Sequence, residues 1–434
     1  MYKYVDYFDR YGRIMQFNKN KLEPVHRWYP FVEGYSKDFI KSIIDEFENK
    51  NLVCLEPFSG SGTTALELQN MGIKCISFEV NPLMYLIGKV KLYSSYSAQE
   101  ASKWHNYIVA GRSGCTIEDL HSEFSTLYEG ENKEKWNFDR AVAVAVEKLR
   151  ISILGIESKE YRDLFLAALS SILLEVSNLY RNGKCLSYKN DWKDLNLTSE
   201  DVYAVFDRKI NSEIIQDIVV LEQTNRNHSP AADNYECLFH EDCRTAIDTK
   251  VEDNSIDLVI TSPPYLNSRD YTDTYMLELK ALGFAKNFED IRAIRNKTIR
   301  SHVQIKWADA ATVNHPFLTA TLDQLETAAS DAGSWNESIL DMIRLYFVDM
   351  QTLFELLYKK VKIGGRIYFN VSNSAYFGVK INTLELCASI AESEGFRVLE
   401  IRKARYLKTS PQQKKSVDKL LEGVLLLERK GNGE

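Results

Sequence analysis

Near its amino terminus the chain contains a strand, a glycine-rich turn, a helix and a second strand in direct succession. An apolar run at residues 52–55 precedes the turn Glu-Pro-Phe-Ser-Gly-Ser-Gly-Thr-Thr at residues 56–64. The hydrophobic pattern predicts a helix from Thr63 to Met71 and a strand at residues 74–78. Units of this kind build parallel sheets, which bind ligands beyond the carboxyl ends of their strands. We therefore expect an α/β fold with a ligand at this turn.

The turn carries two glycines, Gly60 and Gly62, and the acidic residue Glu79 follows at the end of the second strand. Glycines let backbone amides approach a ligand closely, and the start of the next helix offers unpaired N–H groups. A carboxylate at Glu79 can accept both hydroxyls of a ribose. The third glycine of the dinucleotide fingerprint is missing, which disfavours a nicotinamide cofactor and favours an adenosyl ligand without a pyrophosphate. A purely structural glycine turn is the alternative.

A second strand end, at residues 257–265, is abruptly polar and aromatic. Mostly apolar residues at 257–260 are followed by Thr-Ser-Pro-Pro-Tyr. Two consecutive prolines remove two backbone donors, so the segment cannot continue as a helix or an inner strand. Ser262 and the carbonyl of Pro263 can accept hydrogen bonds from an amino group while the ring of Tyr265 stacks on a flat base. A proline-kinked structural loop is the alternative for this motif taken alone.

Composition restricts the class of protein. The chain has 434 residues, 44% of them hydrophobic and 26% charged, which is typical of a globular protein. No apolar run of about 18 residues and no basic-then-apolar leader is present, so we expect a cytoplasmic protein without a membrane span. The seven cysteines are scattered and predict reduced core thiols rather than disulfides, and no ligand spacing indicates a metal. The net charge of −7 argues mildly against nucleic acid, although a local basic face decides phosphate binding.

Helical periods dominate between residues 93 and 235. Helices are expected at about residues 98–110, 133–154, 159–180 and 199–224, and no strand of the βαβ kind is evident. The residues before and after this segment, 1–92 and 236–434, form the sheet domain, so residues 93–235 are predicted to be a helical insertion. Within it, residues 181–193 form a basic and aromatic loop, which is either a solvated turn or a nucleic-acid contact.

The second half of the sheet domain shows further strands and helices. The residues at 237–239 are expected to form a strand that ends in acid. A long helix at about 337–361 leads to a strand at 366–371 and a loop at 372–378, and a helix follows at 383–394. Strands at 397–402 and 423–428 can pair as a terminal hairpin, with a basic segment between them. We therefore predict a mostly parallel sheet with a terminal antiparallel hairpin.

Taken together, these segments resemble the S-adenosylmethionine-dependent amino-group DNA methyltransferases, over roughly residues 24–92 and 236–430. The turn at 55–63, the Glu-Val-Asn-Pro at 79–82 and the Thr-Ser-Pro-Pro-Tyr at 261–265 are similar to motifs of that family. The resemblance implies a Rossmann-like methyltransferase sheet. It implies a catalytic corner of Ser262, Pro263, Pro264 and Tyr265. It implies S-adenosylmethionine-binding residues Tyr29, Pro30, Glu56, Pro57, Phe58, Gly60, Gly62, Thr63, Glu79, Asn81, Asp242, Cys243 and Thr261.

The resemblance further implies a site-specific enzyme of a bacterial restriction-modification system that methylates an amino group of a flipped base in double-stranded DNA. Ser262, where much of the family has aspartate or asparagine, favours N4 of cytosine over N6 of adenine. No cysteine follows a proline, which disfavours methylation at carbon 5 of cytosine. A cognate restriction endonuclease is a candidate partner. The alternatives are an RNA or protein-amide methyltransferase and a non-catalytic S-adenosylmethionine-fold binding protein.

Two basic regions are candidates for contact with DNA. One is the loop at 181–193, and the other is the segment at 280–307, which carries seven cations and two acidic residues. A run of this kind is often only solvated surface. The candidate DNA-binding residues are Arg181, Lys184, Arg269, Arg292, Arg295, Lys297 and Arg300.

Overall fold

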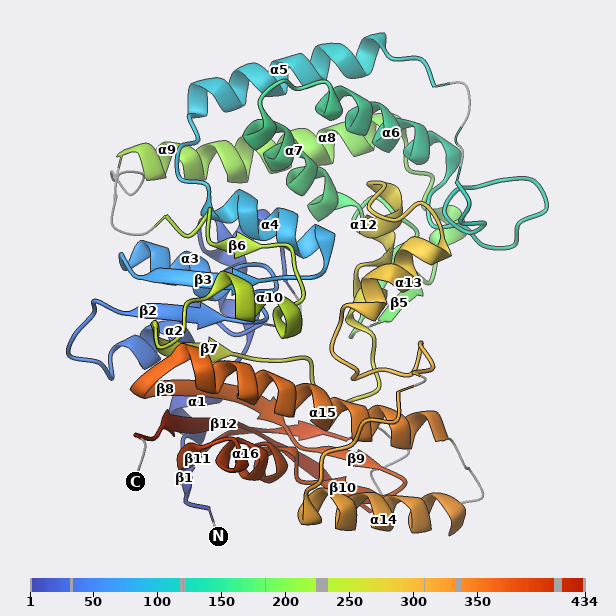
Figure 1. The fold of residues 1–434 in the computed structure, drawn as a ribbon. Coiled ribbons are helices and arrows are strands. Elements are labelled where there is room, and N and C mark those ends of the chain that lie inside the picture. The colour runs from blue at the N-terminus through green and yellow to red at the C-terminus, as the bar shows by residue number, and fades with distance from the viewer. Residues whose placement is uncertain are drawn as a thin grey trace.

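An eight-stranded sheet forms the middle and lower part of the molecule in the computed structural model (Figure 1). Its strands, in spatial order, are β1 (Tyr4–Asp6), β11 (Phe396–Lys408), β12 (Lys419–Arg429), β8 (Val361–Ser372), β7 (Ile256–Thr261), β2 (Val53–Glu56), β3 (Lys74–Phe78) and β6 (Leu238–Phe239). Strand β12 runs antiparallel to both of its neighbours, and the other neighbouring pairs are parallel. The predicted Rossmann-like sheet with a terminal hairpin is thus confirmed, and β1 adds a strand that the sequence did not indicate.

The structure describes residues 2–31, 34–117, 120, 122–183, 185–223, 233–307, 309–331, 337–409 and 416–431. Among these residues, no helix is long and apolar enough to cross a membrane. All seven cysteines are unpaired, and four of them are buried: Cys54, Cys75, Cys243 and Cys387.

Helices cover both faces of the sheet because successive strand residues point to opposite sides. Cys54 of β2 packs in one apolar cluster and its neighbour Leu55 in the other. One face carries α1 (Phe8–Tyr11), α2 (Lys37–Ile44), α3 (Thr63–Asn70) and α4 (Pro82–Leu92). The opposite face carries α10 (Cys243–Lys250), α14 (Pro316–Asp331), α15 (Glu337–Lys360) and α16 (Thr383–Ser393). In Figure 1, α10, α15 and α16 lie in front of the sheet and α1 and α2 behind it.

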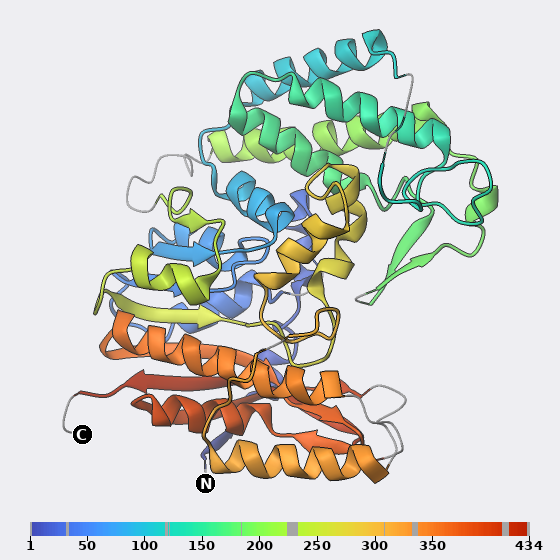
Figure 2. The same cartoon turned by 45° about the vertical axis from the view of Figure 1, so that its right-hand side comes forward.

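A layer of helices lies above the sheet (Figures 1 and 2). It comprises α5 (Ala98–Gly114), α6 (Arg140–Leu154), α7 (Lys159–Ile172), α8 (Ser199–Lys209), the π-helical turn η4 (Ile210–Ile214) and α9 (Ile215–Gln223). The prediction of helices was right here, but the prediction of a loop at residues 181–193 was wrong in part. Strands β4 (Leu179–Asn182) and β5 (Cys185–Tyr188) form an antiparallel hairpin where a loop was expected. Gly183, with a φ of 64°, allows the chain to reverse between them.

Shorter elements connect these layers. They are the 3-10 turns η1 (Phe17–Leu22), η2 (His26–Trp28) and η3 (Trp192–Asp194), and the helices α11 (Tyr271–Thr274), α12 (Met276–Ala281) and α13 (Phe288–Asn296). The expected loop at 372–378 instead contains the first strand of a small hairpin, β9 (Ser374–Tyr376), which pairs with β10 (Val379–Ile381) just after it. The expected basic connection after residue 402 is partly strand as well, because β11 continues to Lys408 against β12; residues 410–415 lie outside the described part.

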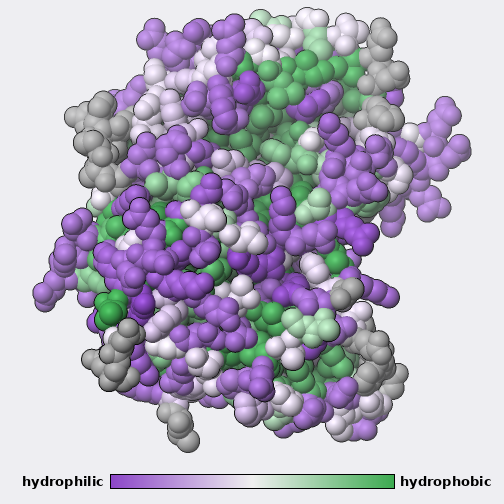
Figure 3. Space-filling model, viewed as in Figure 1, coloured by the Kyte–Doolittle hydropathy of each residue, from purple (hydrophilic) through white to green (hydrophobic). Residues whose placement is uncertain are grey.

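The surface is polar over most of the view in Figure 3, whereas apolar side chains gather over the helical layer at the upper right. Large apolar residues of this layer are exposed on three helices: Tyr107 of α5, Ile151 and Leu154 of α6, and Val220 of α9. The outer face of the helical layer is therefore less hydrophilic than the sheet domain in this view.

Candidate active site

Strands β2 and β7 lie side by side, and the loops that follow them open into the same cavity. The two strands pair in parallel with Cys54 opposite Leu258 and Leu55 opposite Val259. Helix α3 leads from β2 to β3 on one side, while β7 and β8 extend the sheet on the other, so this is a point where the strand order reverses. A cavity of about 510 Å³ lies beyond these strand ends and is lined by both loops. Its size is that of a small-molecule site, about 300–1,000 Å³.

Glu56 ends β2 and lies behind the cavity. Its carboxylate is 1% exposed. It accepts hydrogen bonds from Thr261 Oγ1 at 2.7 Å, the Tyr35 hydroxyl at 2.8 Å, Thr64 Oγ1 at 2.9 Å and the Phe58 backbone N–H at 3.0 Å. Burial raises the pKa of Glu56 to about 7, and these donors oppose the rise. Glu56 and Thr261 thus tie the two loops together from behind and do not line the cavity.

The glycine turn adopts a backbone conformation that residues with a Cβ rarely adopt. Gly60 and Gly62 have φ values of 51° and 80°, in the left-handed region. A Cβ on Gly62 would lie 3.1 Å from the Cα of Gly88 in α4, and a Cβ on Gly60 would lie 2.9 Å from the ring of Phe31. The turn therefore packs α4 closely on one side and leaves its backbone against the cavity on the other.

Glu79, at the end of β3, is held at the cavity by two backbone donors. Gly60 N–H donates to Oε2 at 2.8 Å and Asn81 N–H donates to Oε1 at 2.7 Å. Asn81 in turn caps α4 by accepting from the N–H of Leu83 at 3.0 Å. Burial raises the pKa of Glu79 to about 7. The carboxylate oxygens keep further lone pairs for hydroxyl donors, as a ribose would supply.

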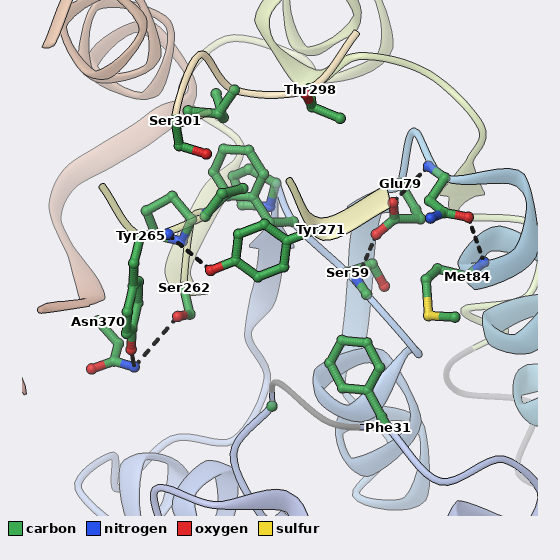
Figure 4. Close-up of a pocket in the computed structure, with 18 of the residues that line it drawn as sticks. Phe31, Ser59, Glu79, Met84, Ser262, Tyr265, Tyr271, Thr298, Ser301 and Asn370 are labelled. Atoms are coloured by element: carbon green, nitrogen blue, oxygen red, sulfur yellow. Dashed lines mark hydrogen bonds between the residues drawn. The ribbon is translucent and has the colours of Figure 1, made fainter. Parts of the chain in front are cut away.

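Most of the predicted cofactor residues line the cavity. Those that do are Pro57, Phe58, Gly60, Thr63, Glu79, Asn81, Asp242 and Cys243. Those that do not are Tyr29, Pro30, Glu56, Gly62 and Thr261. Tyr29 is 1% exposed and turns away, because its hydroxyl donates to the buried Glu278 at 3.2 Å. Its neighbour Phe31 takes the place at the cavity, opposite the glycine turn (Figure 4).

Three walls of the cavity are formed by residues that the sequence did not mark as part of a cofactor site. They are residues 15–18 together with Tyr35, the side chain of Met84, and the segment 297–302 after α13. These walls carry no motif that marks them as part of a cofactor site, although Lys297 was a candidate DNA-binding residue, and they reach the site through long-range packing. Ser59 Oγ, buried at this cavity, has no hydrogen-bond partner within the described chain. An unpaired buried hydroxyl, a glycine cradle and a held carboxylate together fit an adenosyl ligand.

The predicted catalytic corner, Ser262 to Tyr265, lines the opposite end of the same cavity. The Tyr265 hydroxyl donates to Glu422 Oε1 at 2.6 Å and accepts from Asn370 Nδ2 at 2.8 Å. Asn370 Nδ2 also lies 3.4 Å from Ser262 Oγ. The Tyr265 backbone N–H donates to the Tyr271 hydroxyl at 3.1 Å, so a second ring stands beside the corner (Figure 4).

The partners of this corner come from three distant strands. Asn370 lies near the end of β8, Glu422 lies on β12, and Arg405 of β11 forms an ion pair with Glu422. All three line the cavity. No sequence motif marked them, because their relation to Ser262 depends on the order of strands in the sheet.

The predicted DNA-binding cations fall into two groups. Three are engaged by carboxylates of the chain itself: Arg181 by Glu278, Arg295 by Asp270 and Asp273, and Arg300 by Asp309 and Asp349. Three are exposed: Arg269, Arg292 and Lys297, the last of which also lines the cavity. Lys184 lies outside the described residues. Contact with DNA stays a prediction, and the exposed group is the better placed for it.

Comparisons with known proteins agree with this geometry. A family model described as DNA methylase matches residues 13–89. The Type II methyltransferase M.BsoBI of Geobacillus stearothermophilus is 25% identical over 442 residues, which cover 92% of this chain and 84% of the relative. The Type II methyltransferase M.AvaI of Nostoc sp. is 25% identical over 431 residues, which cover 90% and 82%. The Type II methyltransferase M.MvaI of Kocuria varians is 24% identical over 268 residues, which cover 58% and 55%. Because the first two matches span nine-tenths of this chain, the likeness also extends into the helical layer.

Proposed function

Because this chain is an S-adenosylmethionine-dependent amino-group DNA methyltransferase, we propose that it methylates a base flipped out of double-stranded DNA at a specific site, with N4 of cytosine as the favoured target. One observation carries this proposal. The glycine turn with Glu79 and the corner from Ser262 to Tyr265 line opposite ends of a single cavity. A methyl donor at one end then faces an amino group at the other.

The chain's own residues orient the reacting amino group. When bound, S-adenosylmethionine supplies a methyl group on a positively charged sulfur, which is an excellent leaving group. The amino lone pair of cytosine or adenine is delocalised into the ring, so the group is a poor nucleophile. Ser262 Oγ and the Pro263 carbonyl accept its two protons, which makes the nitrogen more pyramidal and turns its lone pair toward the methyl group. Alignment and electrostatics then supply most of the acceleration.

The flipped base needs an aromatic ring on which it can stack. Extrusion of a base from a duplex costs a few kcal/mol, which stacking on an aromatic ring partly offsets. The rings of Tyr265 and Tyr271 both line the cavity beside Ser262 (Figure 4). We assign the stacking role to Tyr265, whose hydroxyl is fixed by Glu422 and Asn370.

Two observations favour N4 of cytosine as the methylated atom: the identity of Ser262 and the state of the Cys243 thiol. Ser262 occupies the position that aspartate or asparagine takes in much of the family. Carbon-5 chemistry needs a reactive thiolate. Cys243, the cysteine that lines the cavity, is 3% exposed, and burial raises the pKa of its thiol well above the usual value. The amino group is therefore the better supported acceptor, and adenine N6 is the second choice.

Target recognition is assigned to two segments. We propose residues 1–92 and 236–434 as the catalytic domain and residues 93–235 as a helical insertion that shares recognition with the segment at 280–335. The hairpin of β4 and β5 supports this, because Arg181 on β4 reaches Glu278 of α12 beside the cavity. The likeness to Type II methyltransferases supports a place in a restriction-modification system with a cognate endonuclease.

Methyl transfer to separate substrates tests the proposal. The purified chain is incubated with labelled S-adenosylmethionine and, in separate reactions, unmodified duplex DNA, RNA and protein extract. Label is expected in DNA alone, and sequencing that reports modified bases is expected to place N4-methylcytosine at one recurrent site. Ser262→Ala serves as the inactive control. Label in RNA or protein would instead indicate an RNA or protein-amide methyltransferase. Retained S-adenosylmethionine binding without any methyl transfer would indicate a non-catalytic binding protein.

A further inference from the structure

A chain of hydrogen bonds leads away from Ser262 to a buried carboxylate. Asn370 Nδ2 bridges Ser262 Oγ at 3.4 Å and the Tyr265 hydroxyl at 2.8 Å, and Tyr265 donates to Glu422 Oε1 at 2.6 Å. Glu422 is 2% exposed and lies on β12, remote in sequence from the corner. Arg405 donates to the other carboxylate oxygen, Oε2, which leaves Oε1 to Tyr265.

The direction of each bond follows from what each group can donate. An amide nitrogen only donates and an ionised carboxylate only accepts, so Tyr265 must give its proton to Glu422 and accept from Asn370. Burial raises the pKa of Tyr265 well above its usual value, the charge of Glu422 raises it further, and a hydrogen bond from Ser262 lowers it. Ser262 therefore donates its proton to Tyr265 and accepts from Asn370. Within the described chain, this leaves one acceptor position on Ser262 Oγ, and Ser262 lines the cavity.

Glu422 is also the carboxylate that lies beside the Ser262–Tyr265 end of the cavity. The described residues put three carboxylates in the lining: Glu79, Asp242 and Glu422. Glu79 is held by the glycine turn, and Asp242 forms an ion pair with Arg244 at 2.7 Å. Of these three described carboxylates, Glu422 is the one joined to the corner by hydrogen bonds, through Tyr265 and Asn370.

We propose that Glu422 receives the proton that the target amino group loses on methylation, through a relay of Ser262 and Tyr265. This inference rests on the proposed function. The amino nitrogen forms its bond to carbon with its own lone pair, while the electron pair of the broken carbon–sulfur bond stays with sulfur. The nitrogen is then cationic and must release one proton.

Every proton in the relay is accounted for. The proton from nitrogen passes to Ser262 Oγ as the Ser262 hydroxyl proton passes to Tyr265, and the Tyr265 hydroxyl proton passes to Glu422 Oε1. The base ends neutral and methylated, both hydroxyls end protonated as they began, and Glu422 ends as a carboxylic acid that returns its proton to water. Because a cationic methylated amino group is strongly acidic, a carboxylate is basic enough to accept. Glu422 and Tyr265 act here through Ser262, so Glu422 is a positioning and proton-accepting residue that does not touch the base.

Single-turnover methylation of unmodified plasmid DNA, measured from pH 5 to pH 9, tests the relay. Wild-type enzyme is expected to slow in acid, because a carboxyl group that already carries a proton cannot accept another. Glu422→Gln is expected to be at least about 10-fold slower at neutral pH and to lack this acidic limb. Tyr265→Phe, which deletes only the hydroxyl, is expected to show the same change, and the double variant to be no slower than either single variant. Glu428→Gln, on the same strand and paired with Arg397, is the matched control and keeps the wild-type profile.

Calorimetric S-adenosylmethionine binding and thermal unfolding accompany the rates and are expected to be retained in Tyr265→Phe. A Glu422→Gln or Tyr265→Phe enzyme with the wild-type rate and profile would overturn the relay while leaving the proposed function standing. A slow variant that keeps the acidic limb would overturn it too, because the role would then be structural. A wild-type enzyme that methylates no DNA would remove the proposed function and the relay together.

Discussion

The side chain of Thr261 donates a hydrogen bond of 2.7 Å to the carboxylate of Glu56, which joins the end of β7 to the end of β2. The same carboxylate holds the glycine turn through Phe58 and helix α3 through Thr64. A single buried group therefore fixes the loop that would hold the methyl donor against the loop that would hold the methyl acceptor. Their separation sets the transfer distance, and a misplacement of about 1 Å can cost roughly 100-fold in rate.

Replacement of Glu56 is expected to disturb both loops. Glu56→Gln puts an amide nitrogen among four donors, so at least one donor loses its acceptor, at a cost of about 1–3 kcal/mol. We expect a lower melting temperature and weaker S-adenosylmethionine binding, measured by thermal unfolding and calorimetry. Glu175→Gln, which removes an exposed partner of Arg208, is the control and should change neither. An unaltered Glu56→Gln protein would show that this linkage is dispensable.

A side chain on Gly60 is expected to close the cofactor end of the cavity. Its φ of 51° costs a non-glycine residue about 1–2 kcal/mol, and the new Cβ would lie 2.9 Å from Phe31. Gly60→Ala should therefore weaken S-adenosylmethionine binding by about 10-fold or more as well as destabilise the fold. Gly283→Ala introduces a similar backbone strain at a φ of 77°, but its new Cβ would have no atom within 4 Å. Its affinity for S-adenosylmethionine should therefore match wild type. Equal affinities of the two variants would contradict the assigned role of the turn.

Lys91 makes the stability of the fold depend on pH. Its amine is 3% exposed and has no hydrogen-bond partner in the described structure, and burial lowers its pKa to about 7. The unfolded chain binds this proton more tightly, so between about pH 7 and the usual lysine value near 10.4 stability rises with pH. Lys91→Met should stabilise the protein by roughly 1–3 kcal/mol at pH 7 and flatten this dependence.

Urea unfolding at pH 7 and pH 9 measures the effect of Lys91→Met. Lys103→Met, at an exposed ion pair with Glu100, should leave the pH dependence as in wild type. If Lys91→Met unfolds with the wild-type difference between the two pH values, Lys91 is not the group responsible.

The cations near α13 are expected to separate into DNA contacts and structural pairs. Arg292→Ala and Lys297→Ala should each reduce the slope of log affinity against log salt by about 1 without changing stability. Arg300→Ala instead removes one of the two arginines paired with the buried Asp349 and leaves Arg244 at 2.9 Å, so it should cost about 1–3 kcal/mol of stability. Fluorescence anisotropy with duplex DNA at several salt concentrations, together with thermal unfolding, distinguishes the two. An unchanged salt slope for Arg292→Ala and Lys297→Ala would remove this face from the DNA interface.

Local signals predicted much of the fold. Strand β3 covers the expected residues 74–78, and α15 begins at the expected Glu337. Errors arose where side-chain patterns were ambiguous. Each strand of the hairpin at 179–188 has only four residues, Leu-Tyr-Arg-Asn and Cys-Leu-Ser-Tyr, and neither shows a regular alternation of apolar and polar residues that would distinguish it from a loop between helices.

The sequence by itself determined the βαβ unit, the glycine turn, the acid that follows it and the serine–proline corner, because each is encoded by neighbouring residues and by backbone rules that act locally. Only the tertiary structure decided what these groups touch. Glu56 turned inward to brace the loops, Phe31 replaced Tyr29 at the cavity, and Glu422 met Tyr265 from 157 positions away. Such partners depend on the order and register of strands in the sheet, which the packing of the whole chain sets and no short stretch of sequence contains.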